Sequence, residues 1–356
     1  DFVGGEGPLR YSDIFLGEKY DARKEIPGWS TPGFYCEGWP KANFTDYPLD
    51  NLRAEYGEPV RAVETIPVSK IIITPKGETV VDFGQVLAGR VEMKVSGPAG
   101  TEVILEHSEV LDEQGNFINN IFGRYKDQMD IYVLNGMGVE TYEPFFTFHG
   151  FRFVKLTGYL GEVKPENFCA HVITSAMESA GSFQCSSTDL NQLQHNILWS
   201  LIGNTLSVPT DCPQRERAGW TGDAQIIAET VCANLGAIPF FEKWMRNLAL
   251  EQKSDGQVPI VIPFISSYQK APQMPLAKDI LSDNCTSAGW GDVVTILPWS
   301  LYQATGDISV LERYYGNMCR WVYYIKNIAE NYNPSDLGPV SPERAKHLKY
   351  LWNTNF

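Results

Sequence analysis

The sequence predicts a multidomain β-plus-α protein in which a jelly-roll-type β-sandwich precedes the first half of an (α/α)6 barrel. Three observations indicate this fold class. The chain has 356 residues, which is more than one ordinary domain holds. Short strand-like runs separated by turn residues dominate up to about residue 182. From about residue 186 onward, the apolar residues recur at helical spacing instead.

Residues 1–60 are rich in glycine, proline and aromatic residues and carry neither a helical nor an alternating pattern. The run Gly-Trp-Ser-Thr-Pro-Gly-Phe at residues 28–34 is typical of this stretch. We expect a loop-rich segment that forms the tail of an N-terminal β domain and a linker. Because residue 1 is not methionine, we also expect a partner of this segment further upstream.

Residues 61–182 are expected to form the β-sandwich. Their apolar and β-branched runs are short and are separated by glycine, proline and asparagine turns. Regularly spaced short strands are typical of a jelly-roll sandwich. The six runs with the clearest strand pattern are 70–74, 79–83, 90–95, 102–107, 128–134 and 151–156.

Residues 183–356 are expected to form the N-terminal part of a truncated (α/α)6 barrel. Several of the helical patterns are apolar on more than one face, as in helices that are buried on two sides. The first predicted helix follows a capping box from Ser186 to Asp189 and is marked by Leu190, Leu193, Ile197 and Leu201. Further helices are predicted over 222–235, 239–252, 292–304 and 308–332.

Composition and charge exclude two classes of partner. Forty-three acidic and 29 basic side chains give a net charge of -14, which would repel the phosphate backbone of a nucleic acid. No run approaches the roughly 18 apolar residues that a membrane span requires. The first ten residues also lack the basic and apolar regions of a signal peptide. We expect a soluble protein, and the composition leaves its compartment and oligomeric state open.

The cysteines and histidines do not indicate a metal site. Seven scattered cysteines form no C-x-x-C pair, so neither a zinc site nor a disulfide framework is expected. We expect most of them to be small buried apolar residues. The five histidines are isolated, and none has the spacing of metal ligands. Two of them, His149 and His171, lie in β segments and are expected to be structural.

The densest cluster of polar residues lies at residues 208–223, where two prolines and two glycines predict a loop between helices. Loops at the rim of a helical barrel are common positions for binding sites. Carboxylates can accept the hydroxyl protons of a diol, a guanidinium can orient a carboxylate, and an indole offers a flat face to a sugar ring. Crowded carboxylates also raise the pKa of at least one of them, which suits a proton donor. The residues concerned are Asp211, Arg215, Glu216, Trp220 and Asp223.

Residues 211–223 resemble the signature of glycoside hydrolase family 78, the α-L-rhamnosidases, whose pattern is close to D-C-P-x-R-E-x-x-G-W-T-G-D. The resemblance implies that Glu216 is the general acid and that Asp211, Asp223 and Trp220 line a rhamnose pocket. It also implies that Arg215 contacts substrate or supports the acid. The expected reaction is hydrolysis of terminal non-reducing α-L-rhamnosides with inversion, which requires no metal or organic cofactor.

The resemblance extends along much of the chain. Residues 7–23 with the following Gly-Trp look like the end of the family's N-terminal sandwich domain, and residues 81–85 look like part of its next β domain. The run Gly-Trp-Gly-Asp at 289–292 is similar to a further active-site loop of the family. It implies that Trp290 and Asp292 are pocket residues.

The general base of the family is a glutamate from a later loop of the barrel, and the resemblance places this loop after Phe356. A histidine that the family uses around the sugar is likewise expected after that point. We therefore expect the polypeptide 1–356 alone to show no rhamnosidase activity, because an inverting mechanism needs an acid and a base. We also expect it to expose apolar helix faces and to self-associate.

Simpler interpretations of the same residues remain open. Glu216 could be a solvated loop carboxylate, Asp211 and Asp223 could be helix caps, and Trp220 could be a core residue. At the level of function, the chain could belong to another (α/α)6 glycosidase with a different sugar preference. It could also be a carbohydrate-binding piece without turnover.

Overall fold

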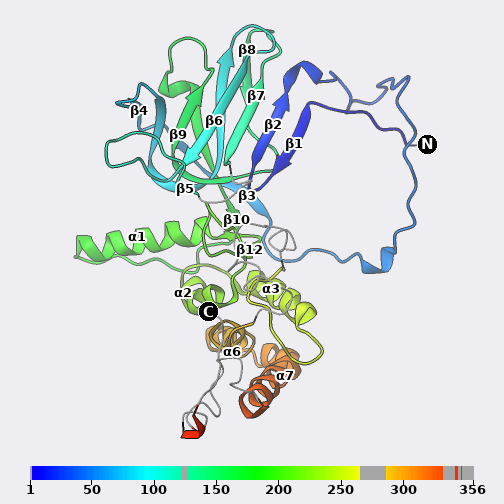
Figure 1. Ribbon diagram of the computed structural model, residues 1–356, viewed down its shortest axis with the longest axis vertical. Coiled ribbons are helices and arrows are strands. Elements are labelled where there is room, and N and C mark those ends of the chain that lie inside the picture. The colour runs from blue at the N-terminus through cyan, green and yellow to red at the C-terminus, as the bar shows by residue number, and fades with distance from the viewer. Residues whose placement is uncertain (1, 122–126, 265–285, 332–340, 344–345, 347–356) are drawn as a thin grey trace. The chain divides into compact units, whose positions relative to one another are not determined.

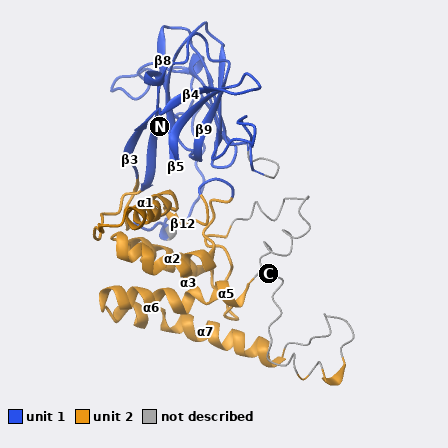
Figure 2. Cartoon of the chain, turned by 90° about the vertical axis from the view of Figure 1, so that its left-hand side faces the viewer, with its two compact units in different colours: residues 1–55, 61–174, 213–215 blue, residues 56–60, 175–212, 216–356 orange. Residues whose placement is uncertain are grey.

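The computed structural model of the protein describes residues 2–121, 127–264, 286–331, 341–343 and 346 (Figure 1). The chain divides into two compact units, which are coloured separately in Figure 2. We call residues 1–55, 61–174 and 213–215 the β unit, and residues 56–60, 175–212 and 216–356 the helical unit. Cys285 and His347 lie outside the described residues.

The β unit contains ten strands in one hydrogen-bonded sheet. Eight of them follow the order β1-β2-β7-β6-β9-β5-β10-β3, and β4 and β8 both pair with β5. The pairing of β2 with β7 is parallel, whereas β5 is antiparallel to β4, β8, β9 and β10. The strands are Leu9–Asp13 (β1), Gly17–Asp21 (β2), Val60–Pro67 (β3), Lys70–Ile73 (β4), Thr79–Ser96 (β5), Glu102–Ser108 (β6), Met129–Val133 (β7), Val139–Tyr142 (β8), His149–Thr157 (β9) and Phe168–Ser175 (β10). Three short 3-10 helices accompany them at Ala22–Lys24 (η1), Leu49–Asn51 (η2) and Pro165–Asn167 (η3).

Strand β5 joins the parts of this sheet because it is long and irregular. Its pairing with β9 shifts register between Asp82 and Leu87, and Gly84 adopts a positive φ of 83° in this interval. The runs 79–83 and 90–95 are therefore two halves of one strand, where the sequence pattern predicted two strands. Beyond the shift, side chains alternate between a buried face with Val91 and Met93 and a partly exposed face with Arg90 and Glu92.

Within residues 1–60, which were expected to be loop-rich, the structure forms strands β1 and β2 and the start of β3. Strand β2 carries Glu18, a carboxylate that is fully buried. It accepts hydrogen bonds from the Ser12 hydroxyl, the Tyr142 hydroxyl and the backbone N–H groups of Phe145 and Phe146. A buried glutamate breaks the apolar alternation of a strand, and its distant partners cannot be read from the local sequence.

The helices of the helical unit agree with the predicted ranges to within two residues at each end. Among the described residues they are Thr188–Gly203 (α1), Thr221–Asn234 (α2), Ile238–Glu251 (α3), Ala288–Gly291 (α5), Val293–Thr305 (α6) and Ser309–Asn331 (α7), and α5 is the one of these six that was not predicted separately. The predicted capping box at Ser186 is displaced by one residue. The N-cap of α1 is Ser187, whose hydroxyl accepts a hydrogen bond from Leu190 N at 3.4 Å. None of the described helices is long and apolar enough to cross a membrane.

The core of the helical unit lies between these helices. Helix α6 contacts α2, α3 and α7, and these four helices are stacked in Figure 2. Trp244 of α3 and Trp321 of α7 are both fully buried in this core. Ile197 of α1 packs against it, while Leu190 and Leu193 are about half exposed, at 50% and 53%. Helix α1 therefore buries its C-terminal half and leaves its first apolar turns open to solvent.

Candidate active site

The loop at residues 208–223 begins as a tight strand pair in the helical unit. Thr205–Leu206 (β11) and Val208–Pro209 (β12) are antiparallel, and Ser207 turns between them with a positive φ of 65°. Thr210 then bonds back to Asn204, through its backbone N–H at 2.9 Å and its hydroxyl at 3.2 Å. This hairpin turns the chain back immediately after α1 and sets the position of Asp211.

Residues 211–218 form a closed ring of backbone contacts. Asp211 N donates to the Ala218 carbonyl at 3.1 Å, and Ala218 N donates to the Asp211 carboxylate at 3.3 Å. Inside this ring, Arg217 N donates to the Cys212 carbonyl, and Glu216 N donates to the Cys212 sulfur at 3.2 Å. Arg217 adopts a positive φ of 49° where the ring turns. The loop therefore fixes the backbone positions of both Asp211 and Glu216.

Cys212 is a member of the site that the sequence argument missed. Its sulfur accepts the Glu216 N–H, and its thiol is hydrogen bonded to the Asp211 carboxylate. Burial and the neighbouring Asp211 raise the pKa of the Cys212 thiol, so it keeps its proton. The signal that could have revealed it is its place in the motif, directly after Asp211 and four residues before Glu216.

Three carboxylates of the loop act on one another electrostatically. Burial, together with the negative charges of Glu216 and Asp223, raises the pKa of Asp211 to about 6, against the lowering effect of the hydrogen bonds from Cys212 and Ala218. Burial and Glu216 also raise the pKa of Asp223. Close carboxylates that disfavour each other's charged forms are typical of acid–base sites. The fold thus brings together the three acidic residues that the motif singled out.

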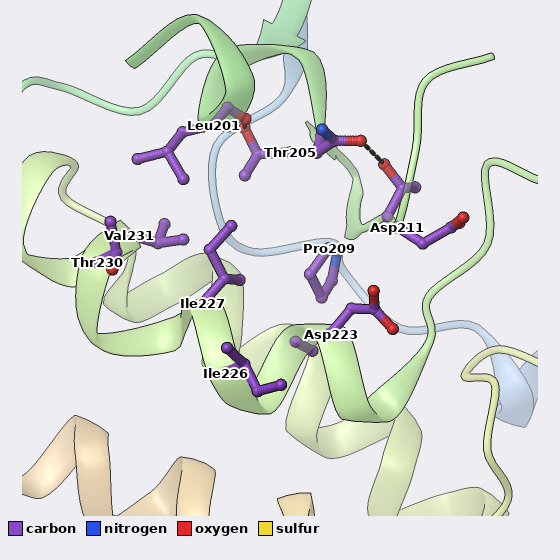
Figure 3. Close-up of a pocket in the computed structure, with 12 residues that line it drawn as sticks. Leu201, Thr205, Pro209, Asp211, Asp223, Ile226, Ile227, Thr230 and Val231 are labelled. Carbon is purple, nitrogen blue, oxygen red and sulfur yellow. Dashed lines mark hydrogen bonds between the residues drawn. The ribbon is translucent and has the colours of Figure 1, made fainter. Parts of the chain in front are cut away.

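A pocket with a volume of about 300 Å³ opens beside two of these carboxylates (Figure 3). Asp211 and Asp223 lie on one side of it, and Ile227 and Val231 line the opposite, apolar side. Glu216 is not among the lining residues. The complete lining is Leu201, Asn204, Thr205, Pro209, Thr210, Asp211, Asp223, Ala224, Ile226, Ile227, Thr230 and Val231.

Neither aspartate caps a helix. The N-cap of α2 is Trp220, which makes no side-chain capping bond, and Asp223 lies in the first turn of the helix. The Asp223 carboxylate accepts a hydrogen bond from its own backbone N–H in that turn, where the helix dipole favours a negative charge, but it does not occupy the N-cap position. Asp211 lies ten residues before α2 begins and accepts its hydrogen bond from the loop itself. The capping interpretation is therefore wrong for both residues.

The two predicted tryptophans meet at one apolar cluster. Trp220 and Trp290 both pack against Ala218, Ile260 and Val261. Trp220 also forms an antiparallel bridge with Val261, so the chain after α3 braces the end of the loop. Both indoles are partly buried, which is compatible with a core role and with an exposed sugar-binding edge.

Gly222 explains how close Trp290 comes to α2. A Cβ atom at Gly222 would lie 2.9 Å from three carbon atoms of the Trp290 ring, closer than real Cβ contacts. The indole therefore packs directly on the helix backbone, one residue before Asp223. This contact requires a glycine in the motif.

The two remaining candidates are engaged in other interactions. Asp292 accepts a hydrogen bond from the buried Trp321 indole at 2.9 Å, at the junction of α5 and α6. Arg215 groups with the β unit, where partial burial raises the pKa of Glu109 and the positive charge of Arg215 acts against that rise. Glu109 is a carboxylate that the sequence argument did not single out. The roles of Asp292 and Arg215 toward a substrate stay predictions.

Three family descriptions match the chain in succession. Residues 1–64 match the alpha-L-rhamnosidase N-terminal domain, and residues 72–174 match the bacterial alpha-L-rhamnosidase concanavalin-like domain. Residues 178–340 match the bacterial alpha-L-rhamnosidase 6 hairpin glycosidase domain. Together these matches define a class of proteins in which β domains precede a glycosidase domain of helical hairpins.

Individual relatives agree with this class. The chain is 37% identical to an alpha-L-rhamnosidase from Streptomyces avermitilis over 92% of its own length and 30% of the relative. The structure of the Streptomyces avermitilis enzyme complexed with L-rhamnose matches with a TM-score of 0.81, over 91% of this chain and 30% of that chain. The alpha-L-rhamnosidase from Dictyoglumus thermophilum matches with a TM-score of 0.83 at 36% identity, over 92% of this chain and 35% of that chain. The chain belongs to the bacterial α-L-rhamnosidases of glycoside hydrolase family 78, and it spans about a third of the length of the curated relatives that it matches.

Proposed function

We propose that the full-length protein hydrolyses terminal non-reducing α-L-rhamnosides, with Glu216 as the general acid. The observation that carries this proposal is the cluster of three carboxylates in one loop, Asp211, Glu216 and Asp223, of which Asp211 and Asp223 line a pocket of the helical unit. The rhamnose complex of a relative that is 37% identical supports rhamnose as the sugar. Rhamnose-containing glycosides are therefore the proposed substrates.

In the proposed reaction, the carboxylates and tryptophans of the site have different roles. Glu216 donates a proton to the glycosidic oxygen as the bond to the leaving group breaks. Asp211 and Asp223 accept hydroxyl protons of the sugar, because ionised carboxylates are acceptors with several lone pairs. Trp220 and Trp290 offer flat apolar faces to the ring. In an inverting reaction a second carboxylate, which we do not assign to a residue, activates water on the opposite face of the sugar.

We propose a domain organisation to match this function. Residues 1–60 complete an N-terminal β domain and a linker, residues 61–182 form a jelly-roll-type β-sandwich, and residues 183–356 contribute the first helices of an (α/α)6 catalytic barrel. The match of residues 178–340 to a six-hairpin glycosidase domain supports the barrel, and the concanavalin-like match supports the sandwich.

The test is hydrolysis of a panel of nitrophenyl glycosides by the full-length protein, with the product anomer followed by NMR. We expect release from the α-L-rhamnoside at a kcat/KM at least about 100-fold above that for α-L-fucosides, α-D-mannosides or β-D-glucosides, and a β-configured first product. Preference for another sugar would favour a different (α/α)6 glycosidase. Tight rhamnoside binding without turnover of any substrate would favour a binding protein.

A further inference from the structure

A second cluster of reactive side chains lies in the β unit, on the partly exposed face of strands β5 and β10. It consists of Glu92, Cys169 and His171. Cys169 and His171 are two residues apart on β10, so both project to the same face of the sheet. Glu92 faces them because β10 pairs with β5 in a register that sets Cys169 opposite Glu92.

The three potential ligand atoms lie close together. His171 Nε2 lies 3.2 Å from Glu92 Oε2 and 3.8 Å from Cys169 Sγ, and all three atoms lie within 4.8 Å of one another. Tetrahedral zinc with bonds of about 2.0–2.1 Å to nitrogen and oxygen and about 2.3 Å to sulfur would need separations of about 3.3 and about 3.6 Å. The observed distances are close to both values.

The second ring nitrogen of His171 is also held. The Thr65 hydroxyl of β3 lies 3.2 Å from His171 Nδ1. A metal-binding histidine usually has its other nitrogen engaged in this way, since the contact fixes the ring orientation and the tautomer. With Nδ1 bonded to Thr65, Nε2 is directed toward Glu92 and Cys169.

The charges and the accessibility of the cluster suit a divalent ion. A divalent ion that displaces the Cys169 thiol proton would meet a thiolate and the Glu92 carboxylate, which together neutralise two positive charges. The nearby Arg90 is directed elsewhere, because it pairs with Glu143 at 2.8 Å and donates to the Pro144 carbonyl. The exposed fractions of the His171 and Glu92 side chains are 19% and 29%. An ion can therefore enter from solvent, and a water molecule can complete its coordination.

The buried group His107, Asp130 and His149 of the same unit does not share this geometry. Its two imidazole rings are stacked, with centroids 4.0 Å apart and planes inclined by 18°. A metal ion binds an imidazole in the plane of the ring, and nearly parallel stacked rings cannot both direct their lone pairs at one ion.

We propose that Glu92, Cys169 and His171 form a zinc-binding site that links strand β10 to strand β5. A sulfur, nitrogen and oxygen donor set favours zinc over magnesium or calcium, which prefer oxygen ligands alone. The sequence alone indicated no such site because strand pairing, not a local motif, brings together ligands as far apart as Glu92 and Cys169, which are 77 positions apart in the sequence. The site lies in the β unit, and its test is independent of hydrolytic activity.

The experiment measures zinc affinity of the purified protein by competition with a chromophoric chelator. We expect one zinc per chain at this site, and a loss of at least about tenfold to 100-fold in affinity for Cys169→Ser, His171→Gln and Glu92→Gln, since even second-sphere changes cost this much. Thr65→Val, which keeps all three ligands, should weaken binding by about tenfold. The matched controls Cys36→Ser and His195→Gln should bind zinc like the parent.

Cobalt substitution supplies a second readout for variants that bind weakly or fold poorly. The parent and both controls should show the near-ultraviolet charge-transfer absorption of a thiolate–cobalt bond, and Cys169→Ser should lose it. Circular dichroism of each variant establishes that the comparison is between folded proteins. Zinc binding that is absent from the parent, or that is unchanged in all three ligand variants, would overturn the proposal and leave a hydrogen-bonded surface cluster.

Discussion

At the scale of single residues, Asp211 has a structural role in the loop and a proposed role in sugar binding. Its carboxylate accepts the Ala218 N–H that closes the loop, and it lies beside the pocket where a sugar hydroxyl would need an acceptor. Burial and two neighbouring carboxylates raise its pKa to about 6, so the charged form that binds best is also the form that the folded protein disfavours. A binding residue whose charged form is disfavoured in the folded protein is expected to lower the free energy of unfolding.

This conflict predicts how stability depends on pH in Asp211→Asn. A raised pKa means that the folded chain holds a proton between pH 4 and 6 that the unfolded chain has released, so the cost of the carboxylate is absent at low pH and grows as pH rises through this window. The amide avoids that cost while still accepting from Ala218. We expect the unfolding free energy of the variant to exceed that of the parent by up to about 3 kcal/mol above pH 7. Below pH 4 the two unfolding free energies should be nearly equal.

Denaturant titrations of both proteins between pH 3.5 and pH 8 measure the difference, with the buffer range chosen around the window of about 4 to 6. Asp189→Asn, an exposed first-turn residue of α1, serves as the control and should show little dependence. A stabilisation that is the same at all pH values, or that appears on acidification, contradicts the environment described for Asp211.

The binding roles of the two aspartates make a separate prediction. Asp211→Ala and Asp223→Ala should each weaken binding of free rhamnose by the full-length protein by about tenfold or more, because each removes an acceptor for a sugar hydroxyl. Isothermal titration measures the affinity, and Asp189→Ala should bind like the parent. If both variants bind the sugar as tightly as the parent, the carboxylates serve only the structure of the loop.

At the scale of elements, the start of α2 is held by backbone contacts with another part of the helical unit. Ile262 N donates to the Gly219 carbonyl at 2.9 Å, and Thr221 N donates to the Ile260 carbonyl at 2.9 Å. A Cβ atom at Gly219 would meet the Ile262 carbonyl oxygen at 2.0 Å. The motif glycines thus allow the loop, the segment 260–262 and Trp290 to pack at backbone distance, and this packing sets the position of Asp223.

A pair of glycine substitutions tests this packing. Ala is normally favoured over Gly in a helix by about 1 kcal/mol. We expect Gly289→Ala of α5 to follow this rule, because a Cβ atom there meets nothing within 4 Å. In Gly222→Ala the new methyl group would overlap the Trp290 ring, and we expect a loss of about 1–3 kcal/mol in unfolding free energy.

Thermal and denaturant unfolding of the two variants gives the comparison, and Trp fluorescence reports any displacement of the indole. The opposite order of stabilities, with Gly222→Ala at or above Gly289→Ala, would mean that Trp290 does not pack on α2 as described.

At the scale of the whole molecule, periodic patterns predicted helices better than strands. Helices α1, α2, α3, α6 and α7 repeat their apolar residues over three turns or more, so their ranges were found to within two residues. Strands β1, β2, β3, β8 and β10 were not among the predicted runs. Of these, β1 pairs with the adjacent β2, whereas β2, β3, β8 and β10 pair with strands far along the chain. Tyr142 of β8 illustrates this, since its hydroxyl bonds to Glu18 across 124 positions.

The parts of the candidate site that lie in one stretch of sequence were predictable, and the parts that come from distant segments were not. The motif at 211–223 was enough to predict the three carboxylates, the tryptophan and the glycines of the site, because one loop contains all of them. The apolar wall of the pocket, with Leu201 and Val231, depends on how α1 and α2 pack, and so does not appear in the motif. Glu109, which responds to the charge of Arg215, is likewise about a hundred residues away in the sequence.

The central claim, that Glu216 is the proton donor to the leaving group, is tested most directly by leaving-group dependence in Glu216→Gln. Natural rhamnosides have poor leaving groups that need protonation, whereas activated aryl rhamnosides need it much less. We expect kcat/KM of the full-length variant to fall by about 10²–10⁴-fold on a natural rhamnoside and by far less on a dinitrophenyl rhamnoside. The exposed Glu312→Gln of α7 should leave both values unchanged. An equal loss on the two substrates would contradict the role of Glu216 as the general acid.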